Sequence, residues 1–147
     1  MKKAVFTLIL ALCLAILTPF ASFAQTDAIQ IGVLQLVEHP ALDAAYKGFV
    51  DGLAEAGFVD GENIEIDFRN AQADQSNLMT MSDRFVKNNV DLILAIATPA
   101  TQSVASATST IPILFTAVTD PVAARLVESW EKPTTRSEER RVGKECR

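Results

Sequence analysis

Three positions in this chain combine residue types that could hold a small charged ligand. Each is a polar residue followed by proline at the end of an apolar run. These pairs are His39-Pro40, Thr98-Pro99 and Asp120-Pro121. Proline is favoured in the first turn of a helix after a polar cap, so each pair predicts a helix start. Free N–H groups at a helix start can receive an anion, and neighbouring side chains can complete a site.

The chemistry that these positions favour is the binding of a carboxylate and an amino group. Backbone N–H groups and the hydroxyls of Thr98, Thr101 and Thr119 could bind the carboxylate. Glu38 or Asp120 could receive the amino group. Alternatively, each polar residue only caps its helix, since a cap contributes roughly 1 kcal/mol without any ligand. The convergence of three pairs on one edge favours a ligand cleft without identifying the ligand.

Apolar runs predict the strands that carry these residues. Residues 29–37, 92–97 and 113–118 are mostly apolar, which is typical of strands covered on both faces. In residues 64–70, apolar side chains alternate with charged ones. We therefore expect this strand to have one wet face and to lie at the edge of the sheet.

Helical spacing of apolar residues predicts a helix after each strand. The first begins at Pro40 and stops at Gly57, in the manner of a C-cap glycine, and the second ends near Asn88. The third covers residues 98–109. The fourth is expected to start at Pro121, with an inward stripe formed by Val122, Leu126 and Trp130.

The regular alternation of strand and helix predicts an α/β fold, in which a parallel sheet is doubly wound with right-handed crossovers. In such sheets ligands bind outside the carboxyl ends of the strands. All three polar-proline pairs, together with residues 70–74, are expected at that edge.

We do not expect the two ends of the chain to belong to this fold. Residues 1–24 carry two lysines, an apolar run and the small-x-small pattern Ser22-Phe23-Ala24, which predicts a secretory signal peptide cleaved after Ala24. Residues 134–147 hold eight charges in fourteen residues and resemble a vector- or adapter-derived read-through, so a non-native, solvated tail is expected. The alternatives are an uncleaved anchor and a genuine basic tail.

The domain between these ends, residues 25–133, is acidic. It contains six Lys or Arg and fifteen Asp or Glu, a net charge of −9, which argues against nucleic acid or an anionic membrane as partner. Both cysteines, Cys13 and Cys146, lie outside it. The domain therefore offers no thiol nucleophile, zinc–thiolate site or disulfide.

The sequence gives little support for catalysis. His39 is the only histidine, and neither a G-x-S-x-G elbow nor a G-x-x-x-x-G-K phosphate loop is present. We expect no enzymatic activity, no cofactor and no metal. The alternatives are a periplasmic flavodoxin-like enzyme with His39 and Glu38 as acid and base, and a metal site formed by Glu38, His39 and Asp120, which is a weak and common combination.

Four stretches of the chain resemble, in order, the substrate-binding proteins of bacterial ABC importers. They are similar to the type I periplasmic-binding-protein group, and specifically to the family associated with tryptophan or tyrosine uptake. The first stretch reads Ile-Gly-Val-Leu-Gln-Leu-Val-Glu-His-Pro-Ala-Leu-Asp. The stretches are residues 31–43, 48–66, 70–77 and 91–121, and the resemblance covers residues 29–133.

The resemblance implies a periplasmic receptor that is monomeric when complete. Two α/β lobes would close on a small amino-acid-like solute, an aromatic one by family, and deliver it to a membrane permease. We expect this chain to hold only the first lobe, because it departs from the family near residue 133. A ligand-sensing domain is an alternative. The implied ligand contacts are Glu38, His39, Thr98, Ala100, Thr101, Thr119 and Asp120.

Overall fold

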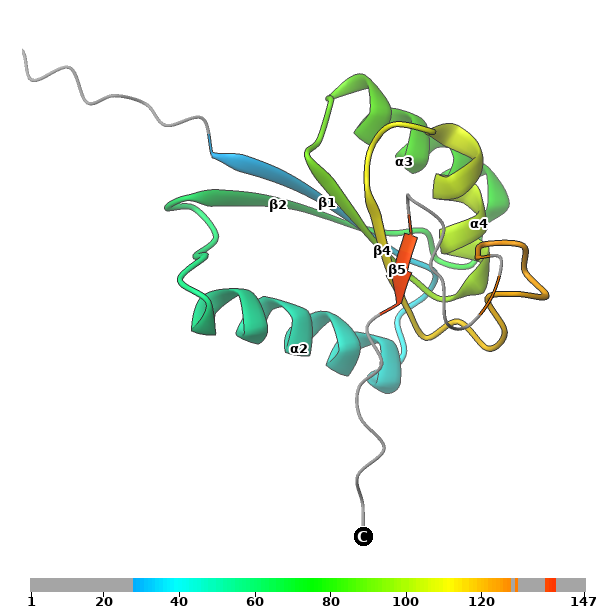
Figure 1. The fold of residues 1–147 in the computed structure, drawn as a ribbon, viewed down its shortest axis with the longest axis horizontal. Helices are drawn as coiled ribbons and strands as arrows, with labels where there is room; N and C mark the ends of the chain where they lie inside the picture. The colour runs from blue at the N-terminus through cyan, green and yellow to red at the C-terminus, as the bar shows by residue number, and fades with distance from the viewer. Residues whose placement is uncertain (1–27, 128, 130–136, 140–147) are drawn as a thin grey trace, which may run out of the picture.

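The computed structural model describes residues 28–127, 129 and 137–139 (Figure 1). The predicted signal peptide and most of residues 134–147 therefore lie outside the described residues. Up to residue 116, strands and helices alternate as the sequence predicts. In chain order, they are β1 (Ile29–Gln35), α2 (Pro40–Glu55), β2 (Ile64–Asn70), α3 (Gln75–Lys87), β3 (Leu92–Ile96), α4 (Thr98–Ala107), β4 (Ile113–Thr116) and β5 (Ser137–Glu139).

The strands form one sheet in the order β2-β1-β3-β4-β5, and every neighbouring pair is parallel. The predicted α/β class with a parallel sheet is confirmed. β1 pairs with strands on both sides, and helices cover both of its faces, which explains why its sequence is mostly apolar. β2 pairs only with β1 among the described strands and forms one edge, as its alternating charges predict.

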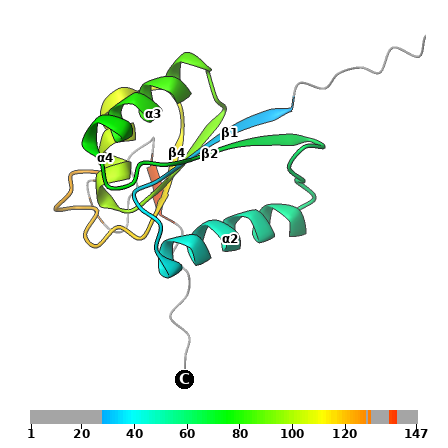
Figure 2. The same ribbon diagram turned by 180° about the vertical axis from the view of Figure 1, so that it is seen from behind.

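The helices cover the two faces of the sheet unequally (Figures 1 and 2). α2 lies on one face, whereas α3 and α4 pack side by side on the other. None of the α2 side chains is fully buried, although Leu42, Tyr46 and Phe49 pack against the sheet. The α3 and α4 face holds the larger core cluster, which includes the fully buried rings of Phe85 and Phe115.

Close packing of α3 on β1 requires a glycine in the middle of the strand. A Cβ atom at Gly32 would lie 2.8 Å from the Phe85 ring, closer than carbon atoms approach without displacement. The only glycine of this strand therefore sets the distance between the α3 layer and the sheet.

The structure corrects the prediction of a helix starting at Pro121. Residues 121–125 form a hydrogen-bonded turn, in which the Leu126 N–H donates to the Pro121 carbonyl at 2.9 Å. Arg125 has a φ of 58°, in the left-handed region, and cannot continue a right-handed helix. Leu126 and Val127 are instead buried in the core, and the predicted stripe residue Trp130 lies outside the described residues.

The structure also differs from the prediction over residues 137–139. These three residues belong to the stretch expected to be a solvated tail, yet they form β5 and pair with β4 from Ile113 to Phe115. This short segment therefore extends the sheet beyond β4.

Within the described part of the chain, no helix combines the length and the apolar character needed to cross a membrane.

Candidate functional site at the carboxyl edge

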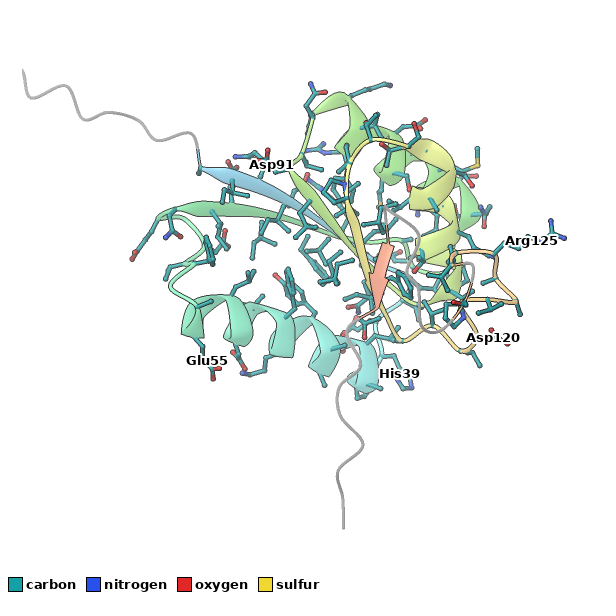
Figure 3. All side chains as sticks on the ribbon, viewed as in Figure 1. His39, Glu55, Asp91, Asp120 and Arg125 are labelled. Carbon is teal, nitrogen blue, oxygen red and sulfur yellow. The ribbon has the colours of Figure 1, made fainter. Side chains whose placement is uncertain are left out.

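The carboxyl ends of four strands meet at one edge of the sheet. The register pairs Gln35 with both Asn70 and Ile96, and Ile96 with Thr116, so these strands end level with one another. Figure 3 shows His39 and Asp120 at this end of the molecule and Glu55 and Asp91 at the opposite end. The sequence prediction that the polar-proline pairs share one edge is confirmed.

The loop that leaves β1 presents Glu38 and His39 to solvent, because both residues are exposed. His39 is the N-cap of α2, and its Nδ1 accepts a hydrogen bond from the Ala41 N–H at 3.2 Å. In a neutral imidazole this places the proton on Nε2. The predicted cap is therefore present, and Glu38 stands beside it as an exposed carboxylate.

The exit of β3 differs from its predicted form. Thr98 is the first residue of α4 rather than its cap, and the N-cap is Ala97, which makes no side-chain capping bond. Ala97 has φ 87° and ψ 154°, a backbone conformation that is otherwise almost restricted to glycine. Thr98 itself is half-buried at the edge.

Ala100 and Thr101 lie below the surface of this edge, because each has 0% of its surface exposed. The Thr101 hydroxyl donates to the Ala97 carbonyl at 3.0 Å, and its backbone N–H donates to the same oxygen at 3.1 Å. In this structure the Thr101 hydroxyl therefore supports the backbone of Ala97, and its predicted contact with a ligand stays a prediction.

The exit of β4 carries Thr119 and Asp120, which are both exposed. One oxygen of Asp120, Oδ1, accepts hydrogen bonds from the N–H groups of Val122 at 3.0 Å and Ala123 at 2.9 Å. The carboxylate therefore caps the turn that follows it. Its second oxygen makes no hydrogen bond to any of the described residues.

The exit of β2 closes the edge on the other side of β1. The Asn70 side chain accepts from the Gln72 N–H at 2.8 Å, and Gln72 and Ala73 both have positive φ angles, 54° and 59°. Asp74 then caps α3 by accepting from the Asn77 N–H at 2.8 Å. This loop was expected at the edge, and the structure places it there.

Sequence reasoning missed one residue of this region, Gln35. It ends β1, its exposed fraction is 1%, and its amide nitrogen donates to both Val37 and Asp43. The available signal was its polarity at the end of an apolar strand, which periodicity alone does not distinguish from an ordinary strand end.

The assembled edge offers hydrogen-bond donors and anionic acceptors to one solute. Donors come from the start of α4, where the N–H groups of Thr98 and Ala100 have no intrahelical acceptor, and from the exposed Thr119 hydroxyl. Acceptors are the carboxylates of Glu38 and Asp120. Within the described ranges, no three His, Cys, Asp or Glu side chains lie close enough to hold a metal ion.

A separate groove of about 360 Å³ lies between α3 and α4, where Ser82 and Ser103 are in hydrogen-bond contact at 3.0 Å. It follows two helices rather than crossing strand ends, and none of the predicted contact residues lines it. We therefore place the candidate site at the carboxyl edge, where the ligands of open parallel sheets bind.

Comparisons with known proteins bear on the family and the fold of the chain. A family model described as ABC transporter substrate binding protein matches residues 30–140. A tyrosine-binding protein of Clostridioides difficile (strain R20291) is 54% identical over 103 residues, which cover 70% of this chain and 30% of that protein. The chain thus spans less than a third of this curated relative.

Solved structures give the same result. A ligand-free, open substrate-binding protein with adhesive properties from Clostridium difficile is 53% identical, with a TM-score of 0.75 over 76% of this chain and 38% of that one. A complex with L-Trp from Streptococcus pneumonia is 48% identical, with a TM-score of 0.73 over the same shares of the two chains. A leucine-binding protein from Thermotoga maritima, 18% identical with a TM-score of 0.54, shares the fold alone. The chain belongs to the family of ABC transporter substrate-binding proteins.

Proposed function

We propose that this chain supplies one wall of a receptor for an aromatic amino acid, tyrosine or tryptophan. The observation that carries the proposal is the match to a tyrosine-binding protein at 54% identity, together with an L-Trp complex at 48% identity. The carboxyl edge supports the proposal, because it carries both hydrogen-bond donors and carboxylates, the two kinds of group that an amino acid requires.

In this proposal the α-carboxylate of the ligand meets the start of α4 and the exit of β4. Thr98 and Thr119 supply hydroxyls, and the first-turn N–H groups of α4 supply further donors. The buried residues Ala100 and Thr101 act through the backbone they hold, rather than through side chains that face the ligand.

In the proposal, the carboxylates of Glu38 and Asp120 bind the ammonium group of the ligand. His39, the exposed N-cap of α2, lies next to Glu38 in the sequence. A charge-assisted hydrogen bond of this kind is about twice as strong as a neutral one. The contacts to the aromatic ring are proposed to come from parts of the receptor beyond the matched region, since the chain spans 38% of the solved relatives.

We further propose that the protein is exported through residues 1–24, acts in the periplasm and hands its solute to the permease of an ABC importer, as a monomer. The family assignment supports this role. A ligand-sensing role uses the same site, and would be favoured if ligand binding changed no rate of uptake.

The test is calorimetry and thermal unfolding of the protein with L-tyrosine and L-tryptophan, with L-leucine as the comparison ligand. At a hundredfold excess over the dissociation constant, a ligand stabilises the folded state by about 2.7 kcal/mol. Asp120→Asn keeps the capping oxygen and removes the charge, so it should weaken binding with little loss of stability. Glu55→Gln, at the opposite end of the molecule, is the matched control.

The enzyme alternative makes a different prediction. If Glu38 and His39 were acid and base, His39→Ala would abolish turnover and leave ligand affinity nearly unchanged. Loss of affinity with no turnover in the unsubstituted protein supports the receptor. Absence of stabilisation by both L-tyrosine and L-tryptophan would contradict it.

A further inference from the structure

One polar side chain lies in the otherwise apolar layer between β1 and α2. Side chains alternate along a strand, so Gln35 shares its face with Ile31 and Val33, which belong to the core cluster beneath α2. Only 1% of the Gln35 surface is exposed. An amide at such a position must find partners inside the protein, because water does not reach it.

The amide nitrogen of Gln35 joins three segments. It donates to the Val37 carbonyl at 2.9 Å, in the loop that leaves β1, and to Asp43 Oδ1 at 2.6 Å, in the first turn of α2. Both of its hydrogens are thereby used. The end of the strand, the exit loop and the helix start are held by one side chain.

These bonds begin where the sheet ladder stops. The Gln35 carbonyl accepts from the Ala71 N–H at 2.9 Å, and the Leu36 N–H donates to the Ile96 carbonyl at 3.3 Å, so the backbone is fixed up to Leu36 by its neighbouring strands. The next anchor is His39, which caps α2 through Nδ1. The bond to Val37 therefore lies between these anchors, directly before the exposed residue Glu38.

The position carries a cost in stability. The Gln35 Oε1 atom is buried and has no hydrogen-bond partner among the described residues. A buried acceptor without a partner destabilises the folded state, whereas an apolar side chain of similar length would not. The hydrogen bonds of the Gln35 amide nitrogen, rather than core packing, therefore explain why a polar residue stands at this position.

We propose that Gln35 is a positioning residue that fixes the backbone of residues 37–39, and so determines where Glu38 and His39 meet a ligand. The inference rests on the proposed function, because it assigns these residues to the amino-acid site. Gln35 itself acts through the loop and does not touch the ligand.

The test compares Gln35→Met with Gln30→Met in the 147-residue chain. Gln30 is a matched control, because it lies on the same strand and its side chain also donates to two acceptors, the Ala28 carbonyl and Glu65, but at the opposite edge of the sheet. Backbone heteronuclear NOE values and amide exchange of residues 37–39 report the order of the loop. Thermal unfolding and titration with L-tyrosine complete the comparison.

For Gln35→Met we expect lower NOE values and faster exchange in residues 37–39, with an unfolding temperature equal to or above that of the unsubstituted chain. The tyrosine dissociation constant should rise about tenfold, the size expected from one to two lost hydrogen bonds. Gln30→Met should change neither loop order nor affinity. If residues 37–39 keep their order in Gln35→Met, or if unfolding temperature and signal dispersion fall across the whole sheet, the proposal is wrong.

Asp43→Ala gives a second route, because Asp43 is exposed and its side chain is not part of the apolar core. It removes one of the two acceptors and should loosen residues 37–39 partially; unchanged loop order in this variant would also count against the proposal. The loop measurements need no ligand. They therefore decide the role of Gln35 separately from the proposed function, which would itself fail if tyrosine shifted no signal of the unsubstituted chain.

Discussion

The two edges of the sheet use different residues where the backbone has a positive φ angle. At the amino edge, positive φ angles occur at Gly57, Gly61 and Asn89, residue types that adopt them at little cost. At the carboxyl edge they occur at residues that carry an ordinary side chain. These are Gln72, Ala73, Ala97 and Ala117, one or two directly after each of β2, β3 and β4.

This difference indicates that the two edges serve different purposes. The amino edge is composed for stability, since its turns use residues suited to their conformation. The carboxyl edge retains backbone strain. A residue such as Ala97, in a sparsely populated φ/ψ region, costs about 1–3 kcal/mol of folding free energy. Such strain is found where binding or catalysis fixes the backbone, which favours this edge as the candidate ligand site.

The largest expected effect comes from Gly57, at the amino edge. Gly57→Ala forces a Cβ atom into a backbone with φ 87° and should destabilise the protein by about 1–2 kcal/mol. Gly48→Ala is the control, because a Cβ at this helical position meets no atom within 4 Å and should stabilise by about 0.5–1 kcal/mol. Urea unfolding measures both. Equal effects of the two substitutions would mean that the positive φ of Gly57 does not require a glycine.

At the carboxyl edge, the converse substitution replaces an alanine at positive φ with glycine. Ala97→Gly releases the strain at φ 87°, and after the added entropy of the unfolded chain we expect a net stabilisation of about 1 kcal/mol. Ala105→Gly, at an exposed position inside α4, should instead destabilise by about 1 kcal/mol. In urea unfolding, the denaturant midpoint should rise for Ala97→Gly and fall for Ala105→Gly, with the m-value unchanged in both. Destabilisation by Ala97→Gly would mean that no strain is stored at this edge.

A smaller effect is expected at alkaline pH, on the α2 side of the molecule. Burial raises the pKa of Tyr46, and the nearby Asp60 carboxylate raises it further. The folded state therefore holds this proton more tightly than the unfolded state, so stability falls as the pH rises through the folded pKa, above about 10. The ring centroids of Tyr46 and Phe68 are 4.5 Å apart, and Tyr46→Phe preserves this packing. The substitution should therefore reduce the loss of stability at alkaline pH. An identical decline in the variant would assign it to other groups.

Much of the fold was predictable because the signals are local. The apolar runs around Val33 and Leu94 indicate buried parallel strands, and the alternating charges of β2 indicate an edge. His39-Pro40 correctly marks a capped helix start, whereas Asp120-Pro121 marks a capped turn where a helix was predicted. The end of the turn after Pro121 was not predictable, because Leu126 and Val127 leave the helical path to enter a core formed by distant segments.

The site was predictable in position but not in detail. Thr101 shares the inward face of α4 with Ala100 and Val104, and this spacing could have revealed that its hydroxyl is buried. The role of Gln35 depends on how α2 packs over β1, a contact between segments that no local pattern reports. The seven implied ligand contacts all stay predictions: Glu38, His39, Thr98, Ala100, Thr101, Thr119 and Asp120.

The most direct test of the account is a titration of the isotope-labelled protein with L-tyrosine, followed through its backbone amide signals. We expect shifts concentrated in residues 37–39, 98–101 and 117–120, with those of residues 57–63 and 88–91 unchanged. Shifts centred on the amino edge or on the groove between α3 and α4, or no shift at millimolar tyrosine, would contradict the assignment of the carboxyl edge as the binding site.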